Sequence, residues 1–245
     1  MKPRLSRLPI LLSCMGGAAF VLRLSLYLAA TDHKGLLIAG HPLEFLLWLL
    51  TAAAAAVVLI SVWKQTDCRS YEENFPCSTA ACIGCFLFAA GFGLTASRGF
   101  PAFSVLEKLR NITGLLSVPA LIAAGICRKL GKRPFFGFHG ILCLALTLHT
   151  ISYYRIWSSS PQLQDALFPM LGCIGLMLFA YYQTAFDADI GSRRMQLGSG
   201  LLAAFCCFAA APVSSTGLMY LTGGIWTLTN MCSLTPATKK KEENQ

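Results

Sequence analysis

Short polar segments divide the chain into long apolar stretches. Each stretch approaches the roughly 20 apolar residues that a helix needs to cross the hydrocarbon core of a bilayer. The pattern predicts eight membrane spans, at residues 8–30, 43–63, 78–97, 112–127, 136–157, 166–186, 197–213 and 217–234. If the last two stretches, joined through residues 212–215, form a re-entrant hairpin, the number of spans is seven.

The apolar stretches are predicted to be helices. Their apolar residues are continuous and do not alternate with polar ones, as they would in the strands of a membrane β-barrel. A helix satisfies its backbone hydrogen bonds within one segment, as lipid requires. The predicted fold is an all-α, polytopic transmembrane helical bundle, with a single domain over residues 1–234. Residues 100–110 mix apolar and charged positions, and we expect them to lie flat on the outer surface before the fourth span.

The composition points to the same class of protein. Of the 245 residues, 55% are hydrophobic and 13% are charged, whereas a soluble domain carries about 25% charged residues. These values exclude a water-soluble globular domain, a disordered chain and a disulfide-rich secreted miniprotein. The net charge of +9 is not accompanied by the signature of a nucleic-acid-binding module, so no nucleic-acid partner is expected.

Lysine and arginine residues near the ends of the predicted spans indicate the orientation. Fourteen of the 20 basic residues fall on the side that contains both termini, and five fall on the opposite side. Because cytoplasmic connections are enriched in Lys and Arg, both termini are predicted to be cytoplasmic. We expect a multi-pass protein of a bacterial plasma membrane, with an uncleaved first span and a disordered basic tail at 235–245.

Polar residues in the outer half of the spans are the candidate ligand-binding residues. An ionisable group inside a bilayer is costly, and for that reason it often marks a functional site. We predict an outward-facing pocket between the first, second, fifth and sixth spans, with six ligand-binding residues: Arg23, Tyr27, Glu44, His149, Tyr153 and Arg155. The alternatives are structural, with an ion pair between Arg23 and Glu44 and a hydrogen-bonded core role for His149.

Histidines and cysteines suggest metal chemistry only at a few positions. His33 and His41, in the first external connection, are candidate ligands for a transition metal. Residues 77, 82 and 85 are cysteines with the spacing of the first three ligands of a plant-type iron–sulfur cluster, but two of them fall within an apolar stretch. We interpret most of the 11 cysteines as packing residues, with a redox pair at Cys82 and Cys85 as the alternative, and expect no cofactor.

The sequence contains no motif for nucleotide hydrolysis, zinc-dependent proteolysis or a serine nucleophile. We therefore predict a non-enzymatic membrane protein that binds or transports a small molecule, or the membrane subunit of a transporter. One alternative is a structural or regulatory subunit that docks a cytoplasmic protein through a basic connection comprising Arg128, Lys129, Lys132 and Arg133. A further alternative is a membrane redox protein or enzyme.

Overall fold

The computed structural model describes residues 7–31, 40–65, 68–99, 104–158 and 163–235, and the regular elements of these ranges are helices. The predicted all-α fold is confirmed for this part of the chain. α3 is a single turn of four residues, and the other helices have 16 to 26 residues. The helices are α1 (Arg7–Ala29), α2 (Pro42–Trp63), α3 (Tyr71–Asn74), α4 (Thr79–Arg98), α5 (Val105–Leu130), α6 (Phe136–Trp157), α7 (Leu163–Asp187), α8 (Arg193–Ala210) and α9 (Gly217–Cys232).

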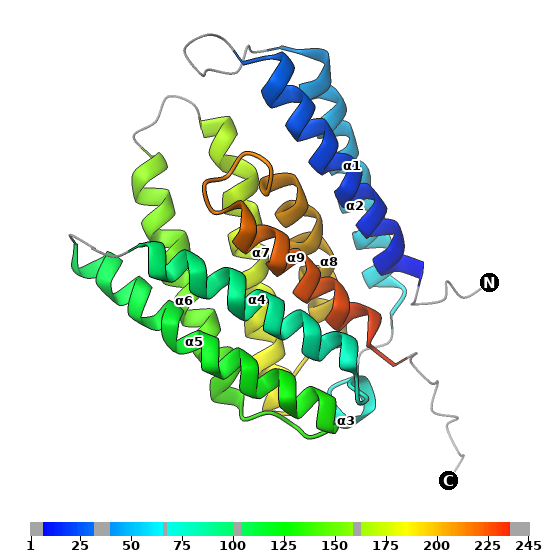
Figure 1. The fold of residues 1–245 in the computed structure, drawn as a ribbon. Coiled ribbons are helices and arrows are strands. Elements are labelled where there is room, and N and C mark those ends of the chain that lie inside the picture. Colours follow the sequence, from blue (N-terminus) through cyan, green and yellow to red (C-terminus); the bar gives the residue numbers. More distant parts are fainter. Residues whose placement is uncertain (1–6, 32–39, 66–67, 100–103, 159–162, 236–245) are drawn as a thin grey trace.

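Successive long helices run in opposite directions, so α1 begins and α9 ends on the same side of the bundle (Figure 1). α4, α5, α6 and α7 pack as a series, and α9 closes the series by packing against both α4 and α7. α8 packs against α7 and α9 on one side and against the α1–α2 pair on the other. α8 and α9 therefore occupy the interior of the bundle.

Within the part of the chain that the structure describes, six helices are long and apolar enough to cross a membrane: α1, α2, α4, α5, α6 and α7. α8 and α9 coincide with the seventh and eighth predicted spans but do not meet this criterion. α9 has 16 residues, and α8 begins with Arg193 and Arg194. Both helices are largely buried by protein, and side chains such as Leu201 and Trp226 have no exposed surface. A helix surrounded by protein need not be as apolar as one that faces lipid.

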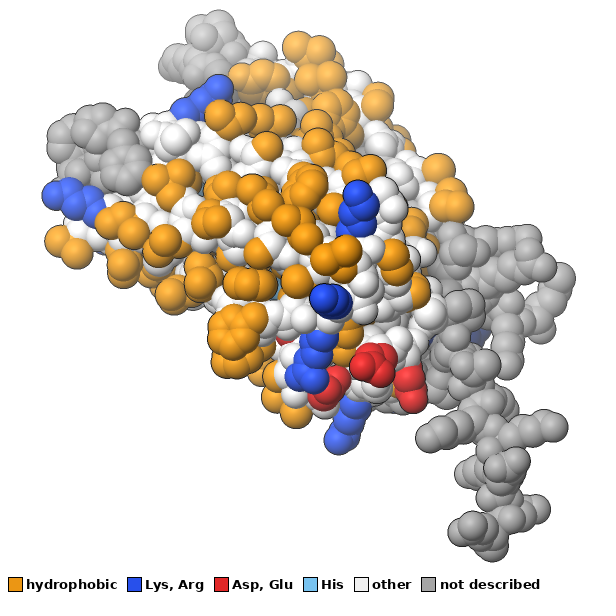
Figure 2. All heavy atoms as spheres, turned by 60° about the horizontal axis from the view of Figure 1, so that its bottom comes forward, with side chains coloured by type: hydrophobic (Ala, Val, Ile, Leu, Met, Phe, Trp, Pro, Cys, Tyr) orange, Lys and Arg blue, Asp and Glu red, His pale blue; other side chains and the backbone are white. Residues whose placement is uncertain are grey.

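The outer surface of the bundle is apolar. Trp63, Leu28 and Phe45 expose 85%, 75% and 73% of their surface, and similar side chains lie along the other outer helices. Figure 2 shows hydrophobic side chains over much of the visible face, with most of the charged side chains towards its lower centre and a few basic ones at the left. Soluble monomers rarely expose continuous apolar surfaces larger than a few hundred Å². The structure therefore supports a multi-pass membrane protein.

The connection before α5 differs from the sequence prediction. The predicted surface helix at 100–110 is wrong where the structure describes it, because α5 runs without interruption from Val105 to Leu130. A capping box starts the helix: the Ser104 hydroxyl accepts from Glu107 N, and the Glu107 carboxylate accepts from Ser104 N, each at 3.2 Å. Such reciprocal hydrogen bonds satisfy backbone donors that a helix start leaves free. Residues 100–103 lie outside the described ranges.

Two glycines allow α4 and α9 to pack in close contact. A Cβ atom at Gly84 would lie 2.1 Å from Thr229 Oγ1, and one at Gly91 would lie 2.2 Å from Thr222 Oγ1. Small residues at a helix interface let two backbones approach closely, which favours association in lipid. This contact fixes the start of α9 beside the end of α4, where the candidate site lies.

Candidate functional site

A cavity of about 290 Å³ lies where α4 ends, α5 begins and α9 begins, with α6 as its remaining wall. We call it the arginine cavity. The last turns of α4 and the second and third turns of α5 line the cavity. The α8–α9 connection adds two hydroxyl groups to the lining. Its polar lining residues are Thr95, Arg98, Arg110, Asn111, His149, Ser215 and Thr216.

Hydrogen bonds hold Arg110 and Asn111 in place at the wall of the arginine cavity. Arg110 Nε donates to Asn111 Oδ1 at 3.0 Å, and Arg110 Nη1 donates to Ser152 Oγ on α6 at 3.0 Å. Asn111 Nδ2 donates to the carbonyl of Gly99 at 2.8 Å, which ties α5 to the end of α4. The guanidinium is therefore fixed by partners on two helices.

His149 brings an imidazole from α6 to the same cavity. Its side chain is 7% exposed, and its Nε2 atom is buried without a hydrogen-bond partner among the described residues. Two aromatic rings hold the imidazole: Tyr153 stacks on it with a centroid distance of 6.4 Å, and Phe92 meets it edge-on at 6.4 Å. A buried polar atom that lacks a partner is unusual in a native protein and suggests an interaction with a ligand or water.

The arginine cavity is electropositive. Two guanidinium groups line it, and among its described lining residues none carries a carboxylate. Glu107 lies close enough to Arg110 to act on it electrostatically, but that carboxylate caps the start of α5. Guanidinium groups bind carboxylates and phosphates through charge-assisted hydrogen bonds. The chemistry of the cavity therefore suits a small anion.

A second hollow of about 220 Å³ has a lining of mixed charge. It is lined by Glu107 and Arg155, and by Ser152, whose hydroxyl accepts from Arg110. Ser152 and Arg110 therefore connect the two hollows. Arg155, one of the residues predicted from the sequence, belongs to this second hollow.

The structure brings together only some of the predicted ligand-binding residues. His149 and Tyr153 are in ring contact beside the arginine cavity, and Arg155 follows on the same helix. The other three lie on the α1–α2 pair: Arg23 is 5.3 Å from the ring centroid of Phe168, Tyr27 is exposed, and Glu44 accepts from Gly40 N at 3.3 Å. A ligand-binding role for these six residues stays a prediction.

Arg98, Arg110 and Asn111 were not among the residues predicted from the sequence. They lie in or next to residues 100–110, for which the sequence predicts a surface helix, so the sequence does not indicate their place in the bundle. The signal that locates Arg110 and Asn111 is the Ser104–Glu107 capping box, which sets the start of α5 at residue 105 and places both residues in its second turn.

The opposite end of the bundle holds a hydrogen-bonded network, which we call the basic end. Arg193 Nη1 donates to Asn74 Oδ1 at 2.7 Å, and the Asn74 carbonyl accepts from Thr235 N at 3.1 Å. Arg194 Nε donates to the carbonyl of Gln65 at 2.7 Å. These contacts tie the ends of α2, α3 and α9 to the start of α8.

The four residues predicted to dock a partner also lie at the basic end. Arg128 is 1% exposed, and its guanidinium donates to Ser233 Oγ at 2.7 Å and lies 4.5 Å from the ring centroid of Phe75. Lys129 and Lys132 are exposed. Arg133 is paired with Asp189. A docking surface here would therefore be formed by the two lysines and Arg133, without Arg128.

The candidate metal ligands do not form a cluster in the described part of the chain, where no three His, Cys, Asp or Glu side chains gather. His33 lies outside the described ranges, and His41 caps α2 by accepting from Leu43 N at 3.3 Å. All 11 cysteines fall in the described ranges as free thiols, and Cys82 and Cys85 are buried. Cys77 donates to the carbonyl of Lys129 at 2.7 Å.

Comparison of the chain with protein-family models, with curated proteins and with solved structures found no match. The function is therefore argued from the residues of the site. The features that carry chemical information are two guanidinium groups, an amide and a buried imidazole nitrogen around one cavity.

Proposed function

We propose that this multi-pass membrane protein binds a small anionic molecule in the arginine cavity, as the binding step of a transporter or of its membrane subunit. The observation that carries the proposal is the electropositive lining, in which Arg110 is fixed by two helices and His149 presents a nitrogen that has no hydrogen-bond partner among the described residues. A carboxylate or phosphate group would accept from the guanidinium groups and meet the imidazole. The volume of about 290 Å³ is near the lower end for small-molecule sites.

The proposal includes a topology of eight crossings in a bacterial plasma membrane with both termini cytoplasmic. The basic end would then face the cytoplasm, and the arginine cavity would face the outside. Two features support it: the alternating direction of the long helices (Figure 1) and the excess of basic residues on the side of the termini. α8 and α9 would cross as interior helices, shielded from lipid by their neighbours.

Anion binding is tested on the full-length protein in mild detergent. The thermal unfolding midpoint is measured at constant ionic strength with added inorganic phosphate, acetate or succinate. We expect at least one of these anions to raise the midpoint, because a ligand that binds only the folded state stabilises it. Arg110→Gln should weaken the apparent affinity by about 10- to 100-fold, as expected for loss of a hydrogen bond from a charged donor.

Lys108→Gln is the matched control, since Lys108 is an exposed residue of the same helix that does not line the cavity. It removes the same charge and should leave the affinity unchanged. If no anion stabilises the protein, or if the two variants behave alike, the cavity is not an anion site. Uptake of the stabilising anion into proteoliposomes then separates a transporter from a protein that only binds it.

A role in docking a cytoplasmic protein is the second proposal, and the exposure of Lys129 and Lys132 at the basic end favours it. A protein that copurifies with the wild type and is lost after Lys129→Glu with Lys132→Glu would support this role. Retention of the same companion by the double variant would argue against it.

A further inference from the structure

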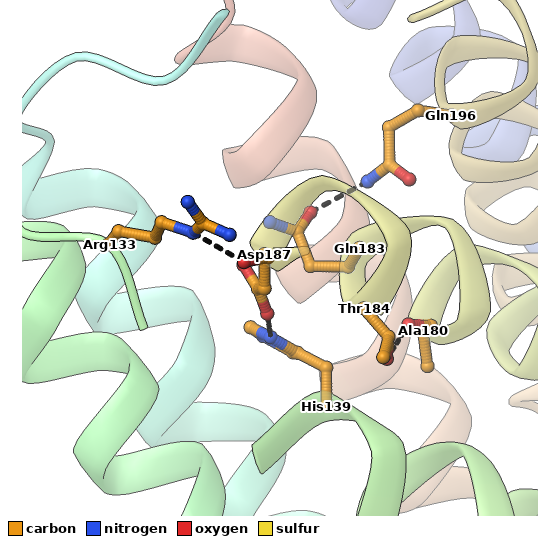
Figure 3. Close-up of polar contacts among 7 residues, drawn as sticks. All are labelled: Arg133, His139, Ala180, Gln183, Thr184, Asp187 and Gln196. Carbon is orange, nitrogen blue, oxygen red and sulfur yellow. Dashed lines mark hydrogen bonds and ion pairs between the residues drawn. The ribbon is translucent and has the colours of Figure 1, made fainter. Parts of the chain in front are cut away.

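A second polar site lies inside the bundle near the basic end. His139 Nδ1 and Asp187 Oδ2 are 2.6 Å apart, and the two side chains are 3% and 0% exposed. His139 lies in the first turn of α6, and Asp187 is the last residue of α7 (Figure 3). An imidazole and a carboxylate at this distance share one proton in a hydrogen bond.

Several polar atoms around this pair have no hydrogen-bond partner among the described residues. They are Asp187 Oδ1, Gln183 Nε2, Gln196 Oε1 and two nitrogens of Arg128, all with almost no exposed surface. Gln183 precedes Asp187 by one turn of α7 and accepts from Gln196 Nε2 at 2.7 Å (Figure 3). A buried ion pair that serves only stability has its remaining polar atoms satisfied, because each unsatisfied atom costs about 1–3 kcal/mol. Unpaired donors and acceptors around the pair suit water molecules that carry protons.

The solvent-exposed Arg133–Asp189 ion pair lies next to the buried His139–Asp187 pair. Arg133 donates to the backbone carbonyl of Asp187 (Figure 3) and pairs with the carboxylate of Asp189. The Arg133 and Asp189 side chains are 43% and 48% exposed, so water reaches this contact. Asp189 has a left-handed backbone conformation with φ of 58° and also accepts from Tyr71 N at 3.0 Å. A solvent-exposed side chain therefore contacts the backbone of Asp187.

Titratable groups on α3, α4, α5 and the α5–α6 connection act on the pair. Arg128 of α5 and Arg133 of the α5–α6 connection act electrostatically on the Asp187 carboxylate. Tyr71 of α3 and Cys85 of α4 are also within electrostatic reach of that carboxylate. The interior neighbours from α8 and α9 are the neutral side chains of Gln196 and Trp226. Asp187 is therefore the carboxylate in contact with the imidazole, and two arginines act on the same carboxylate.

We propose that His139 and Asp187 form a proton-binding site that takes up one proton from the basic end. In the unloaded form the carboxylate is charged, and the neutral imidazole donates its Nδ1 proton to it. The loaded form carries one more proton on the pair, with the imidazole cationic beside the carboxylate. This inference stands apart from anion binding, since it concerns other residues at the other end of the bundle.

Trp226 provides a local readout of this proton. Its indole stacks on the His139 imidazole, with ring centroids 6.3 Å apart and an angle of 19° between the planes. A cationic imidazole in such contact quenches indole fluorescence, whereas a neutral imidazole quenches it less. The protein has four tryptophans, so Trp48, Trp63 and Trp157 are replaced by Phe to leave Trp226 alone. We expect fluorescence to fall as the pH is lowered through about 8 to 5, where imidazoles titrate.

Variants separate the proposed site from other titrating groups. His139→Gln should abolish the transition, and Asp187→Asn should alter it, because the carboxylate that contacts the imidazole is gone. His149→Gln is the matched control on the same helix and should leave the transition in place. Constant fluorescence between pH 5 and 8, or a transition that survives His139→Gln, would overturn the proposal.

A second measurement leaves His139 and Asp187 unchanged, so it tests the proposal even if the variants of these two residues fail to fold. The ¹⁵N chemical shifts of the His139 ring are recorded in liposomes, with the other three histidines replaced by Gln. Protonation converts both ring nitrogens to the imidazolium type. If the shifts stay constant over the same pH range, the pair takes up no proton and the proposal is wrong.

Discussion

The contact between α7 and α8 depends on the absence of a side chain at Gly175. A Cβ atom there would lie 2.8 Å from the Cα of Ala203 and 3.3 Å from its backbone nitrogen. Because these are backbone atoms, no rotation of a side chain can relieve the overlap. Gly175→Ala therefore requires α7 and α8 to separate by about 0.6 Å, from 2.8 Å to the 3.4 Å at which ordinary van der Waals contact begins.

The expected loss of stability follows from two opposing terms. Overpacking of a well-packed interior costs about 1–3 kcal/mol. Replacing glycine by alanine within a helix returns about 1 kcal/mol, because alanine has less backbone freedom to lose on folding. Gly175→Ala should therefore lower the free energy of unfolding by about 0–2 kcal/mol. Gly17→Ala is the control, since Gly17 is exposed on α1 and a Cβ atom there would meet no described residue within 4 Å apart from its chain neighbours and the backbone of its own helix.

The assay is reversible unfolding of the purified protein in mixed detergent–SDS micelles, followed by circular dichroism. Gly17→Ala should raise the free energy of unfolding by about 0.5–1 kcal/mol. The difference between the two variants isolates the steric term, and we expect it to be about 1–3 kcal/mol. If Gly175→Ala is as stable as Gly17→Ala, α7 and α8 are not in backbone contact at this position, and the packing of α8 in the interior is wrong.

Two further predictions concern the connections. Burial, together with a hydrogen bond to Glu73 at 2.8 Å, raises the pKa of the Cys68 thiol, so less thiolate is present at a given pH. Alkylation of Cys68, measured by peptide mass spectrometry, should therefore be slow at pH 7 and accelerate as the pH rises. Glu73→Gln should speed the alkylation at pH 7, and an unchanged rate in this variant would contradict the prediction. The second prediction concerns the topology. Ser215→Cys in the α8–α9 connection should react with a membrane-impermeant maleimide on intact cells, whereas Cys77 should react only after permeabilisation. If intact cells label both positions or neither, eight crossings are excluded.

The sequence by itself predicted the helices, because continuous apolar runs in lipid leave a helix as the structure that satisfies its own backbone. α6 has the predicted bounds, 136–157, and α1, α2 and α4 begin and end within one residue of prediction. α5 was placed seven residues too late, since charged residues in its first turns broke the apolar run. His149 is a candidate from the sequence for a physical reason, because an ionisable side chain within an apolar stretch is costly, and its role in ligand binding stays a prediction.

Only the tertiary structure decided which polar side chains meet. Arg110 and His149 face one cavity because α4, α5, α6 and α9 pack around it, and no local pattern encodes which helices are neighbours. His139 and Asp187 are 48 residues apart in the chain, and each alone looks like a polar residue at the end of a span. The interior position of α8 and α9 was likewise hidden, since hydropathy measures how apolar a segment is and not whether lipid or protein surrounds it. Local chemistry thus determined the helices, and packing between distant segments determined the sites.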